Sequence, residues 1–387
     1  MRLHLPRACR GDLVHKVTFG MFDWLDRRPG PLLHDLYDER LELVALAEQA
    51  GFHGYYLAEH HGTPLGLCPS PNVFLSALAR STTTIRLGPM CWLLPLYEPL
   101  RLFEELCMLD QLSHGRLEVG LGRGVSRHEL GFYNLGVDET RARFEEALAV
   151  LLRAIEVSRT GGTLTTSGPH YAYREVPLVL SPLQDPYPPL WYPTSSLSSA
   201  AWAGSRHLHL MGLGPARQFR ALADAYRRAA AAPSLSDAEA PLNPDAAELR
   251  VGMNRQIIVC ETDDEARRVL DAAFPAWKAN FTRLAVDRQD AGEASQAELR
   301  HYEARTSLHA LLDDGVILAG SPETVRRGLA DVVRTADLSY LACTFAWGAV
   351  SSEQARRSLS LFADEVAPSF LDGTWDRSGA PSSDATS

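Results

Sequence analysis

The chain has 387 residues, of which 45% are apolar and 22% charged, and its 48 acidic and 38 basic side chains give a formal net charge of −10. Such a composition is typical of a globular protein that buries a large core without disulfide or metal cross-links. The acidic balance argues against non-specific nucleic-acid binding, and the absence of a long uncharged apolar run argues against a membrane span.

Two further features bear on the compartment. Residues 1–17 contain basic side chains without an apolar run after them, so they do not predict a signal peptide. The six cysteines show neither a CxxC pair nor a regular spacing, which predicts buried free thiols and a reducing, cytoplasmic setting. These cysteines are Cys9, Cys68, Cys91, Cys107, Cys260 and Cys343.

The first half of the chain alternates a short apolar run, a loop and an amphipathic stretch, without a sequence repeat. The apolar runs predict strands at residues 17–22, 54–58, 85–94 and 117–121. Helices are predicted over 71–80 and 140–158, and on the apolar faces Tyr37–Leu41–Val44–Ala47 and Leu102–Leu106–Leu109.

The second half continues this alternation with two interruptions. Residues 160–188, rich in Gly and Pro, are expected to form an inserted loop, with a hairpin as one option, and the polar residues 279–312 a second, mobile insertion. Residues 230–248 are expected to be an exposed connection and 373–387 a disordered tail. The remaining predicted elements are strands at 190–192, 207–211, 251–260 and 340–345, and helices on the faces Val325–Leu329–Val332 and Ala355–Leu359–Phe362–Val366.

Eight strand–helix units indicate a parallel sheet with helices outside, and this number suits a closed (β/α)8 TIM barrel with insertions after strands 4 and 7. We therefore expect a single barrel domain over residues 1–372, with the insertions at about 160–188 and 279–312. An open, doubly wound sheet is the alternative. It would need a glycine-rich turn after the first strand, and Gly20 and Gly30 lack the GxGxxG spacing.

Catalytic groups of a barrel follow the carboxyl ends of its strands, and Glu59-His60-His61 directly follows a predicted strand. An acid beside an imidazole suits a general base with an orienting partner. A metal site is one alternative, but adjacent residues leaving a strand point to opposite sides, and neither an HxH nor an HExxH pattern is present. A packing or helix-capping role is the other alternative.

Two further strand ends offer groups that bind anions. Gly120, Gly122 and Gly124 let a ligand approach the backbone, and Arg123 among them could hold a phosphate, although it could equally pair with a neighbouring carboxylate. Residues 194–199 contain five hydroxyl side chains before a predicted helix, whose start is a phosphate site, whereas simple capping would need only one. Together these segments predict a clamp for a phosphorylated cofactor or substrate.

The chain also resembles the bacterial luciferase-like flavin monooxygenases over residues 17–370. The resemblance implies a TIM barrel, usually dimeric, that uses reduced FMN and dioxygen. The blocks that carry it are RLGPMCWLLPLYEPLRLFEELCMLDQLSHGRLEVGLGRG, GFHGYYLAEHH, GSPETVRRGLADVV and LFADEVAPSF.

The resemblance also implies roles for single residues. His60 matches the catalytic histidine, with Glu59 beside it, and Arg123 matches the arginine that binds the FMN phosphate. The other cofactor-binding positions that match are Met90, Cys91, Gly122, Ser196 and Ser199. In the family, a non-prolyl cis peptide at the pair Met90–Cys91 lies against the isoalloxazine ring, whereas simple core packing is the alternative for these two side chains.

This sequence departs from the family at two positions. Glu98 stands where a histidine is common, so no histidine is expected to assist the chemistry there. Gly122 stands where a reactive cysteine is known, so thiol sensitivity is not expected at that position.

The implied function is that of a two-component monooxygenase, which receives reduced FMN from a separate flavin reductase and inserts one oxygen atom into a small organic substrate through a flavin 4a-hydroperoxide. His60 would move protons, and the two insertions would be candidate lids. Three alternatives remain: a deazaflavin-dependent oxidoreductase on the same fold, a metal-dependent barrel hydrolase that uses Glu59, His60 and His61, and a non-catalytic flavin-binding relative.

Overall fold

A computed structural model describes residues 16–124, 126–232, 240–244, 246–290 and 306–375. The strands are β1 Thr18–Asp23, β2 Gly54–Leu57, β3 Arg86–Pro89, β4 Trp92–Leu93, β5 Val119–Gly122, β6 Thr163–Ser167, β7 Ala172–Pro177, β8 Leu190–Pro193, β9 His209–Gly212, β10 Val251–Val259, β11 Ile317–Gly320 and β12 Tyr340–Thr344. The helices are α1 Leu33–Gln49, α2 Pro71–Ser81, α3 Pro99–Leu112, α4 Arg127–Gly131, α5 Val137–Ser158, α6 Leu197–Ser205, α7 Ala216–Ala230, α8 Asp263–Asp290, α10 Leu308–Asp313, α11 Pro322–Ala336, α12 Ser352–Leu361 and α13 Ala367–Asp372. A π-helical turn, Phe362–Val366, joins α12 to α13.

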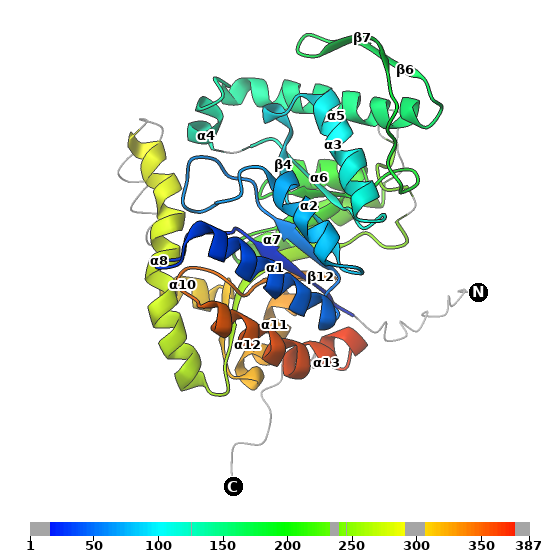
Figure 1. Cartoon of the computed structure of the whole chain (residues 1–387). Helices are drawn as coiled ribbons and strands as arrows, with labels where there is room; N and C mark the ends of the chain where they lie inside the picture. Colours follow the sequence, from blue (N-terminus) through cyan, green and yellow to red (C-terminus); the bar gives the residue numbers. More distant parts are fainter. Residues whose placement is uncertain (1–15, 125, 233–239, 245, 291–305, 376–387) are drawn as a thin grey trace, which may run out of the picture.

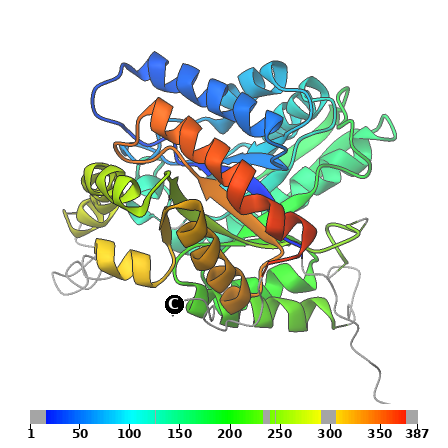
Figure 2. The same cartoon turned by 90° about the horizontal axis from the view of Figure 1, so that it is seen from below.

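The central sheet is parallel and runs in the order β3-β2-β1-β12-β10-β9-β8-β5-β4. The two ends of this order meet at Leu87, whose N–H donates to the Arg116 carbonyl at 3.1 Å and whose carbonyl accepts from the Glu118 N–H at 2.9 Å. Strands lie at the centre and helices surround them (Figures 1 and 2). The predicted TIM barrel is therefore confirmed, and each of the eight predicted strands has a counterpart.

The insertion after the fourth barrel strand contains the hairpin that was one option for residues 160–188. Strands β6 and β7 pair antiparallel, with a register shift between Leu164 and Thr166. The hairpin projects beyond α5, away from the barrel (Figure 1). It therefore adds no strand to the central sheet.

Three predictions about element bounds were wrong. The third strand does not run continuously over 85–94, because it breaks between Pro89 and Trp92 into β3 and β4. Strand β11 was not predicted, and it extends the sheet by pairing with the second half of β10. The first residues of the second predicted insertion, 279–290, continue helix α8. The rest of that predicted insertion up to residue 305 lies outside the described residues.

The connection 230–248 and the tail beyond 373 also differ from expectation where the structure describes them. Leu242 and Asn243 are buried, at 6% exposure each, because the Asn243 side chain bonds both the N–H and the carbonyl of Leu190 at 2.8 Å. Trp375 is buried and stacks on Phe370 with ring centroids 5.4 Å apart. Residues 376–387 lie outside the described residues.

The barrel separates two apolar regions, as a parallel sheet covered on both faces requires. The larger one lies between the strands and the surrounding helices, and the smaller one contains Phe22, Trp24, Met90 and Trp191. All nine residues of β10 are buried, which fits a strand covered on both faces. Among the described helices, none combines the length and the apolar character needed to cross a membrane.

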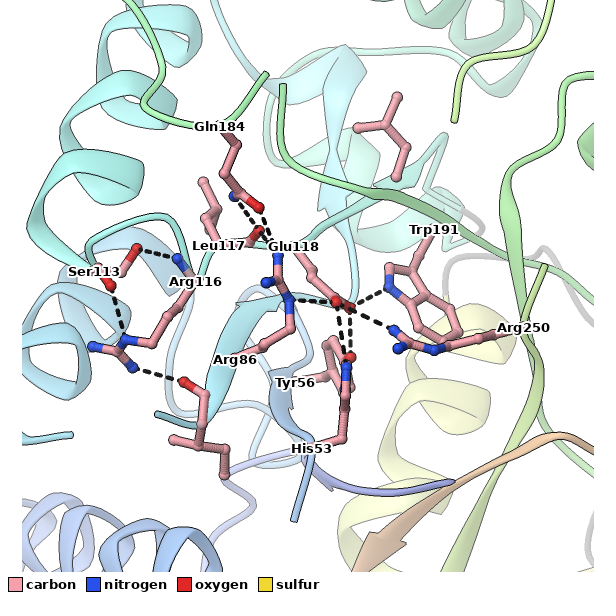
Figure 3. A network of polar contacts seen from close by, with 12 residues as sticks. His53, Tyr56, Arg86, Ser113, Arg116, Leu117, Glu118, Gln184, Trp191 and Arg250 are labelled. Carbon is pink, nitrogen blue, oxygen red and sulfur yellow. Dashed lines mark hydrogen bonds and ion pairs between the residues drawn. The ribbon is translucent and has the colours of Figure 1, made fainter. Parts of the chain in front are cut away.

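A polar network around Glu118, itself 1% exposed, fills the amino end of the barrel (Figure 3). The carboxylate accepts from the Tyr56 hydroxyl and the Trp191 indole, both at 2.6 Å. Arg86 Nε lies 2.6 Å and Arg250 Nη1 3.3 Å from it. Burial alone would raise the pKa of Glu118, but the neighbouring cations, Arg86 first, hold it at about 2.

Two histidines complete this network. Burial, helped by the nearby arginines and opposed by Glu118, lowers the pKa of both His53 and His209 to about 4. His53 Nδ1 lies 3.3 Å from the Tyr340 hydroxyl, and His209 Nδ1 accepts the Arg250 N–H at 3.1 Å. Because these residues precede or begin their strands, the network closes the end of the barrel opposite to the strand carboxyl ends.

Candidate active site

The predicted site residues all follow the carboxyl ends of barrel strands, as barrel enzymes require. Glu59 and His60 follow β2, the pair Met90–Cys91 separates β3 from β4, Arg123 follows β5, and Ser196 follows β8. The fold therefore places all of them at one end of the barrel, opposite to the Glu118 network.

His60 is oriented by a carboxylate that sequence reasoning missed. Its Nδ1 lies 3.0 Å from Glu129 Oε1, and the same oxygen accepts the His61 N–H at 2.8 Å. Glu129 is 3% exposed. Burial alone would raise its pKa, but the hydrogen bond from His60 and the other bonds to this carboxylate hold the pKa below its usual range. The His60 ring is also stacked on the Trp24 ring, with centroids 5.5 Å apart and 27° between the planes.

The sequence pattern at Ser126–Glu129 predicts a role for Glu129, but a different one from that in the structure. Ser126 and Glu129 have the spacing of a capping box, in which the glutamate would bond back to the serine N–H. Ser126 does cap α4, because its Oγ accepts the Glu129 N–H at 3.2 Å. The Glu129 carboxylate instead reaches across to the two histidines that follow β2.

Glu59 does not orient His60, as the adjacency in sequence suggested, but bonds to His61. Its Oε1 lies 3.0 Å from His61 Nε2, and its Oε2 accepts the Leu93 N–H at 3.2 Å and the Tyr97 hydroxyl at 2.8 Å. Glu59 is 4% exposed, and burial raises its pKa despite these hydrogen bonds. The Tyr133 hydroxyl lies 2.8 Å from the remaining His61 nitrogen, Nδ1. In the described part of the chain, no group of three or more His, Cys, Asp or Glu could hold a metal ion.

The Met90–Cys91 peptide bond is cis, as the resemblance implied. The side chains next to it explain the glycine at position 122, because a Cβ built there would overlap Cys91 Sγ. Burial raises the pKa of the Cys91 thiol well above its usual range, so this sulfur stays protonated. Gly120 is equally constrained, since a Cβ there would lie 2.6 Å from the Pro89 carbonyl oxygen.

A pocket of about 90 Å³ opens beside Arg123, with the start of α6 as one wall. Ser198, Ser199 and Tyr192 line it together with Arg123. Burial raises the pKa of Tyr192, and the neighbouring Arg123 guanidinium opposes this rise. A second guanidinium, Arg141 of α5, also lines this pocket. No pattern in the sequence pointed to Arg141, because its place depends on how α5 packs beside α6.

Ser196 lies at the edge of this pocket. Its Oγ accepts the Ser199 N–H at 3.5 Å and lies 3.0 Å from Ser198 Oγ, so it caps α6. Ser199, the other predicted hydroxyl, lines the pocket directly, as does Ser198.

Contacts connect the pocket to the two histidines. Arg123 lines the pocket and follows Gly122, the last residue of β5, and Gly122 abuts Cys91. The Glu59 carboxylate bonds the Leu93 N–H two residues beyond Cys91 and also bonds His61. The pocket, a close-packed backbone surface and an imidazole–carboxylate pair are therefore connected. Such an arrangement can hold a phosphorylated planar ligand and move a proton beside it.

The chain is similar in sequence to proteins of one family. The family model described as luciferase-like monooxygenase matches residues 17–338. An uncharacterized protein of Sinorhizobium fredii, y4wF, is 36% identical over 87% of this chain and 92% of its own length. The oxygenase component of a flavin-dependent trigonelline monooxygenase from Acinetobacter baylyi is 31% identical, over 40% of this chain and 42% of its own length.

Solved structures share the fold. Monooxygenase RslO1 from Streptomyces bottropensis aligns with a TM-score of 0.71 and 24% identity over 92% of this chain and all of its own. The oxygenating constituent of 3,6-diketocamphane monooxygenase from Pseudomonas putida, solved with FMN, aligns with a TM-score of 0.71 and 20% identity over 91% of this chain and 98% of its own.

Proposed function

The chain belongs to the luciferase-like monooxygenase family, and we propose that it is the FMN-dependent oxygenase component of a two-component system. In this proposal a separate reductase supplies reduced FMN, and one atom of dioxygen is inserted into a small organic substrate. The observation that carries it is the pocket of Arg123, Arg141, Ser198 and Ser199 beside the Met90–Cys91 peptide.

The donors of this pocket fit a phosphate monoester. Two guanidiniums supply positive charge and forked N–H donors, and two hydroxyls supply neutral ones. The Glu145 carboxylate also lines the pocket and, 3.7 Å from Arg141, offsets part of the charge of that guanidinium. The N-terminus of α6, a helix of 9 residues, adds the positive end of its dipole. A dianionic phosphate would thus meet charge and hydrogen bonds from three elements.

Reduced FMN, when bound, would supply the electrons that activate dioxygen. We propose that Arg123, Arg141, Ser198 and Ser199 bind its phosphate and that Ser196 shapes the start of α6 by capping it. Met90, Cys91 and Gly122 would form the surface against which the ring lies. Gly122 would keep this surface in place, because its lack of a side chain leaves room for the Cys91 sulfur.

His60 is the proposed proton-transfer group. Its Nδ1 is held by Glu129, so Nε2 remains to take up or release a proton. Trp24 fixes the plane of the imidazole by stacking on it. A Cβ at Gly66 would lie 2.6 Å from the His60 Cβ, so this glycine allows the histidine backbone to sit where it does.

The names of relatives support the finer parts of this proposal. One relative is called an oxygenase component, which supports a separate reductase, and one structure with the same fold contains FMN. We also propose a homodimer in the cytoplasm and a single barrel domain over residues 1–372. The described cysteines, Cys68, Cys91, Cys107, Cys260 and Cys343, are all free.

Reconstitution tests the proposed function. The purified protein is mixed in air with chemically reduced FMN or with a reduced deazaflavin, in the presence of candidate carbonyl and aromatic substrates. FMN should bind, and a product heavier by one oxygen atom should appear by mass spectrometry. Tight binding of the deazaflavin with hydride transfer and without oxygenated product would favour the oxidoreductase alternative. FMN binding without any turnover would favour a non-catalytic relative.

A further inference from the structure

We propose that Tyr133, His61 and Glu59 form a proton-conducting chain from the protein surface to the interior beside the Met90–Cys91 peptide. In this proposal, protons taken up or released during turnover pass along the chain rather than through His60 alone. The inference extends the proposed function, since it depends on chemistry at the same end of the barrel. It gives a role to Glu59 and His61, which the assignment of His60 leaves unexplained.

The side chains of Tyr133, His61 and Glu59 form an unbroken series of close polar contacts from the surface to the interior. The Tyr133 hydroxyl lies 2.8 Å from His61 Nδ1, and His61 Nε2 lies 3.0 Å from Glu59 Oε1. Glu59 Oε2 in turn accepts the Tyr97 hydroxyl at 2.8 Å. Exposure falls along the chain, from 45% for Tyr133 through 11% for the His61 side chain to 1% for the Glu59 side chain.

Imidazole is suited to such a chain because its two nitrogens face different partners. A proton that reaches His61 Nδ1 from water through the Tyr133 hydroxyl converts the ring to imidazolium. Loss of the Nε2 proton to Glu59 Oε1 then leaves a neutral imidazole and a neutral carboxylic acid. One proton has moved from water to the interior, and the reverse sequence returns it.

Glu59 is a suitable end point for the proton. Its carboxyl group is buried, and burial raises its pKa, so its neutral form is more accessible than that of an exposed glutamate. It also lies beside the proposed cofactor surface, because its Oε2 accepts the Leu93 N–H just after the Met90–Cys91 pair.

The proton-conducting chain is separate from the His60–Glu129 pair, although Glu129 contacts residues of both. Glu129 Oε1 bonds the ring of His60 but, from His61, accepts the backbone N–H. The two ring nitrogens of His61 bond Glu59 and Tyr133 instead. The titratable groups that face the His61 ring are thus Glu59 and Tyr133, with Tyr97 beyond Glu59 and Glu129 behind the backbone. Removing Tyr133 or the His61 ring should therefore leave the His60–Glu129 hydrogen bond in place.

The first test uses the protein without cofactor. The carboxylic acid band of Glu59 is identified in the infrared spectrum by its loss in Glu59→Gln, at a pH where the neutral form is populated. Its exchange after mixing with D2O is then timed. Tyr133→Phe, which keeps the ring on the surface, should slow this exchange at least several-fold, and His61→Gln should slow it more.

The second test follows reoxidation of reduced FMN by dioxygen in stopped flow, which needs no substrate. Tyr133→Phe should lower the rate of hydrogen peroxide release, increase its solvent isotope effect, and regain rate when millimolar imidazole buffer is added. Tyr173→Phe is the matched control, because the Tyr173 hydroxyl bonds Glu98, which is not part of the proton-conducting chain. This variant should leave the peroxide release rate and its isotope effect unchanged.

The outcomes separate this inference from the proposed function. Unchanged deuterium exchange and unchanged isotope effects in both Tyr133→Phe and His61→Gln, with FMN bound normally, would overturn the proton chain and leave the cofactor assignment intact. Failure of the wild-type protein to bind FMN would overturn the proposed function, and the exchange measurement on the free protein would still decide whether the chain conducts protons.

Discussion

The sulfur of Cys91 occupies the space into which a side chain at position 122 would extend. A Cβ built on Gly122 overlaps Cys91 Sγ, with Leu93 Cδ2 at 3.4 Å on the other side. The two residues come from neighbouring strands, β5 and the break between β3 and β4. Their contact sets the shape of the surface proposed to face the cofactor ring.

Gly122→Ala should therefore destabilise the fold by about 1–3 kcal/mol, the usual cost of overpacking, and should weaken FMN binding. The double variant with Cys91→Ala should regain most of the loss, since the alanine removes the sulfur that the new methyl group meets. Unfolding by urea and FMN titration measure both effects. Gly131→Ala is the control, because a Cβ there has no atom within 4 Å. Strictly additive losses in the double variant would refute the contact.

Arg123→Ala should weaken FMN binding by about 10- to 100-fold, the range expected for a charge-assisted hydrogen-bond pair. Riboflavin binding should change little, because riboflavin lacks the phosphate. Arg141→Ala should act in the same direction but more weakly, since Arg141 is exposed and also lies 3.7 Å from Glu145. Fluorescence titration with both flavins measures this, with the nearby exposed Arg127→Ala as control. Equal losses for the two flavins would make Arg123 a structural residue.

His60→Ala should keep FMN binding and lower the yield of oxygenated product strongly. Glu129→Gln should lower the yield by a smaller factor, about 10-fold. An amide can offer His60 Nδ1 either an accepting oxygen or a donating NH2 group, so it no longer fixes the imidazole tautomer as the carboxylate does. Nitrogen-15 NMR of the His60 ring would report the tautomer directly, independently of turnover. Glu48→Gln, which removes a carboxylate bound to backbone N–H groups on a different loop, serves as control. Wild-type product yield in His60→Ala would remove this residue from the mechanism.

The Glu118 network should make stability depend on pH. His53 and His209 have pKa values of about 4, below the ordinary 6.5, so below pH 6.5 the unfolded chain binds protons that the folded protein does not. Stability that is fully present above pH 6.5 is therefore lost as the pH falls towards 4. Between pH 7 and pH 5 the loss should be about 2 kcal/mol per histidine.

Urea unfolding at the two pH values checks this expectation. His53→Gln should show a smaller loss on acidification than the wild type. His34→Gln should not, because the His34 side chain is 72% exposed. The same dependence on pH in all three proteins would contradict the account.

The strand pattern was predictable because parallel barrel strands are apolar over their whole length. Once the strands were predicted, the residues directly after them could be expected to meet, since the carboxyl ends of parallel strands lie at one end of the barrel. Strand β11, Ile317–Gly320, escaped prediction because it closely follows the polar segment that was assigned to an insertion. The burial of Leu242 escaped it because the neighbouring residues are those of a typical exposed loop. Asn243, which bonds the backbone of Leu190, holds this segment against the barrel.

The candidate site shows the same division. Glu59, His60 and Arg123 were predicted because they follow predicted strands, and Met90 and Cys91 were predicted from the family resemblance. Glu129 and Arg141 were not predicted, because each extends to the site from a helix. The apolar pattern of a helix does not indicate which of its polar side chains contacts another element. The adjacency of Glu59 and His60 suggested a pair that does not form, since neighbouring side chains at a strand end point apart.

A single oxygen atom, Glu129 Oε1, serves both His60 and the backbone of His61. Substitutions at positions 60 and 129 are consequently not independent, and a double-mutant cycle between them should be non-additive. Position 61 should couple to neither, because any residue there except proline keeps the backbone N–H that Glu129 binds. During evolution or laboratory selection, a change at position 60 or 129 would alter which replacements the other tolerates, whereas position 61 would vary independently of both.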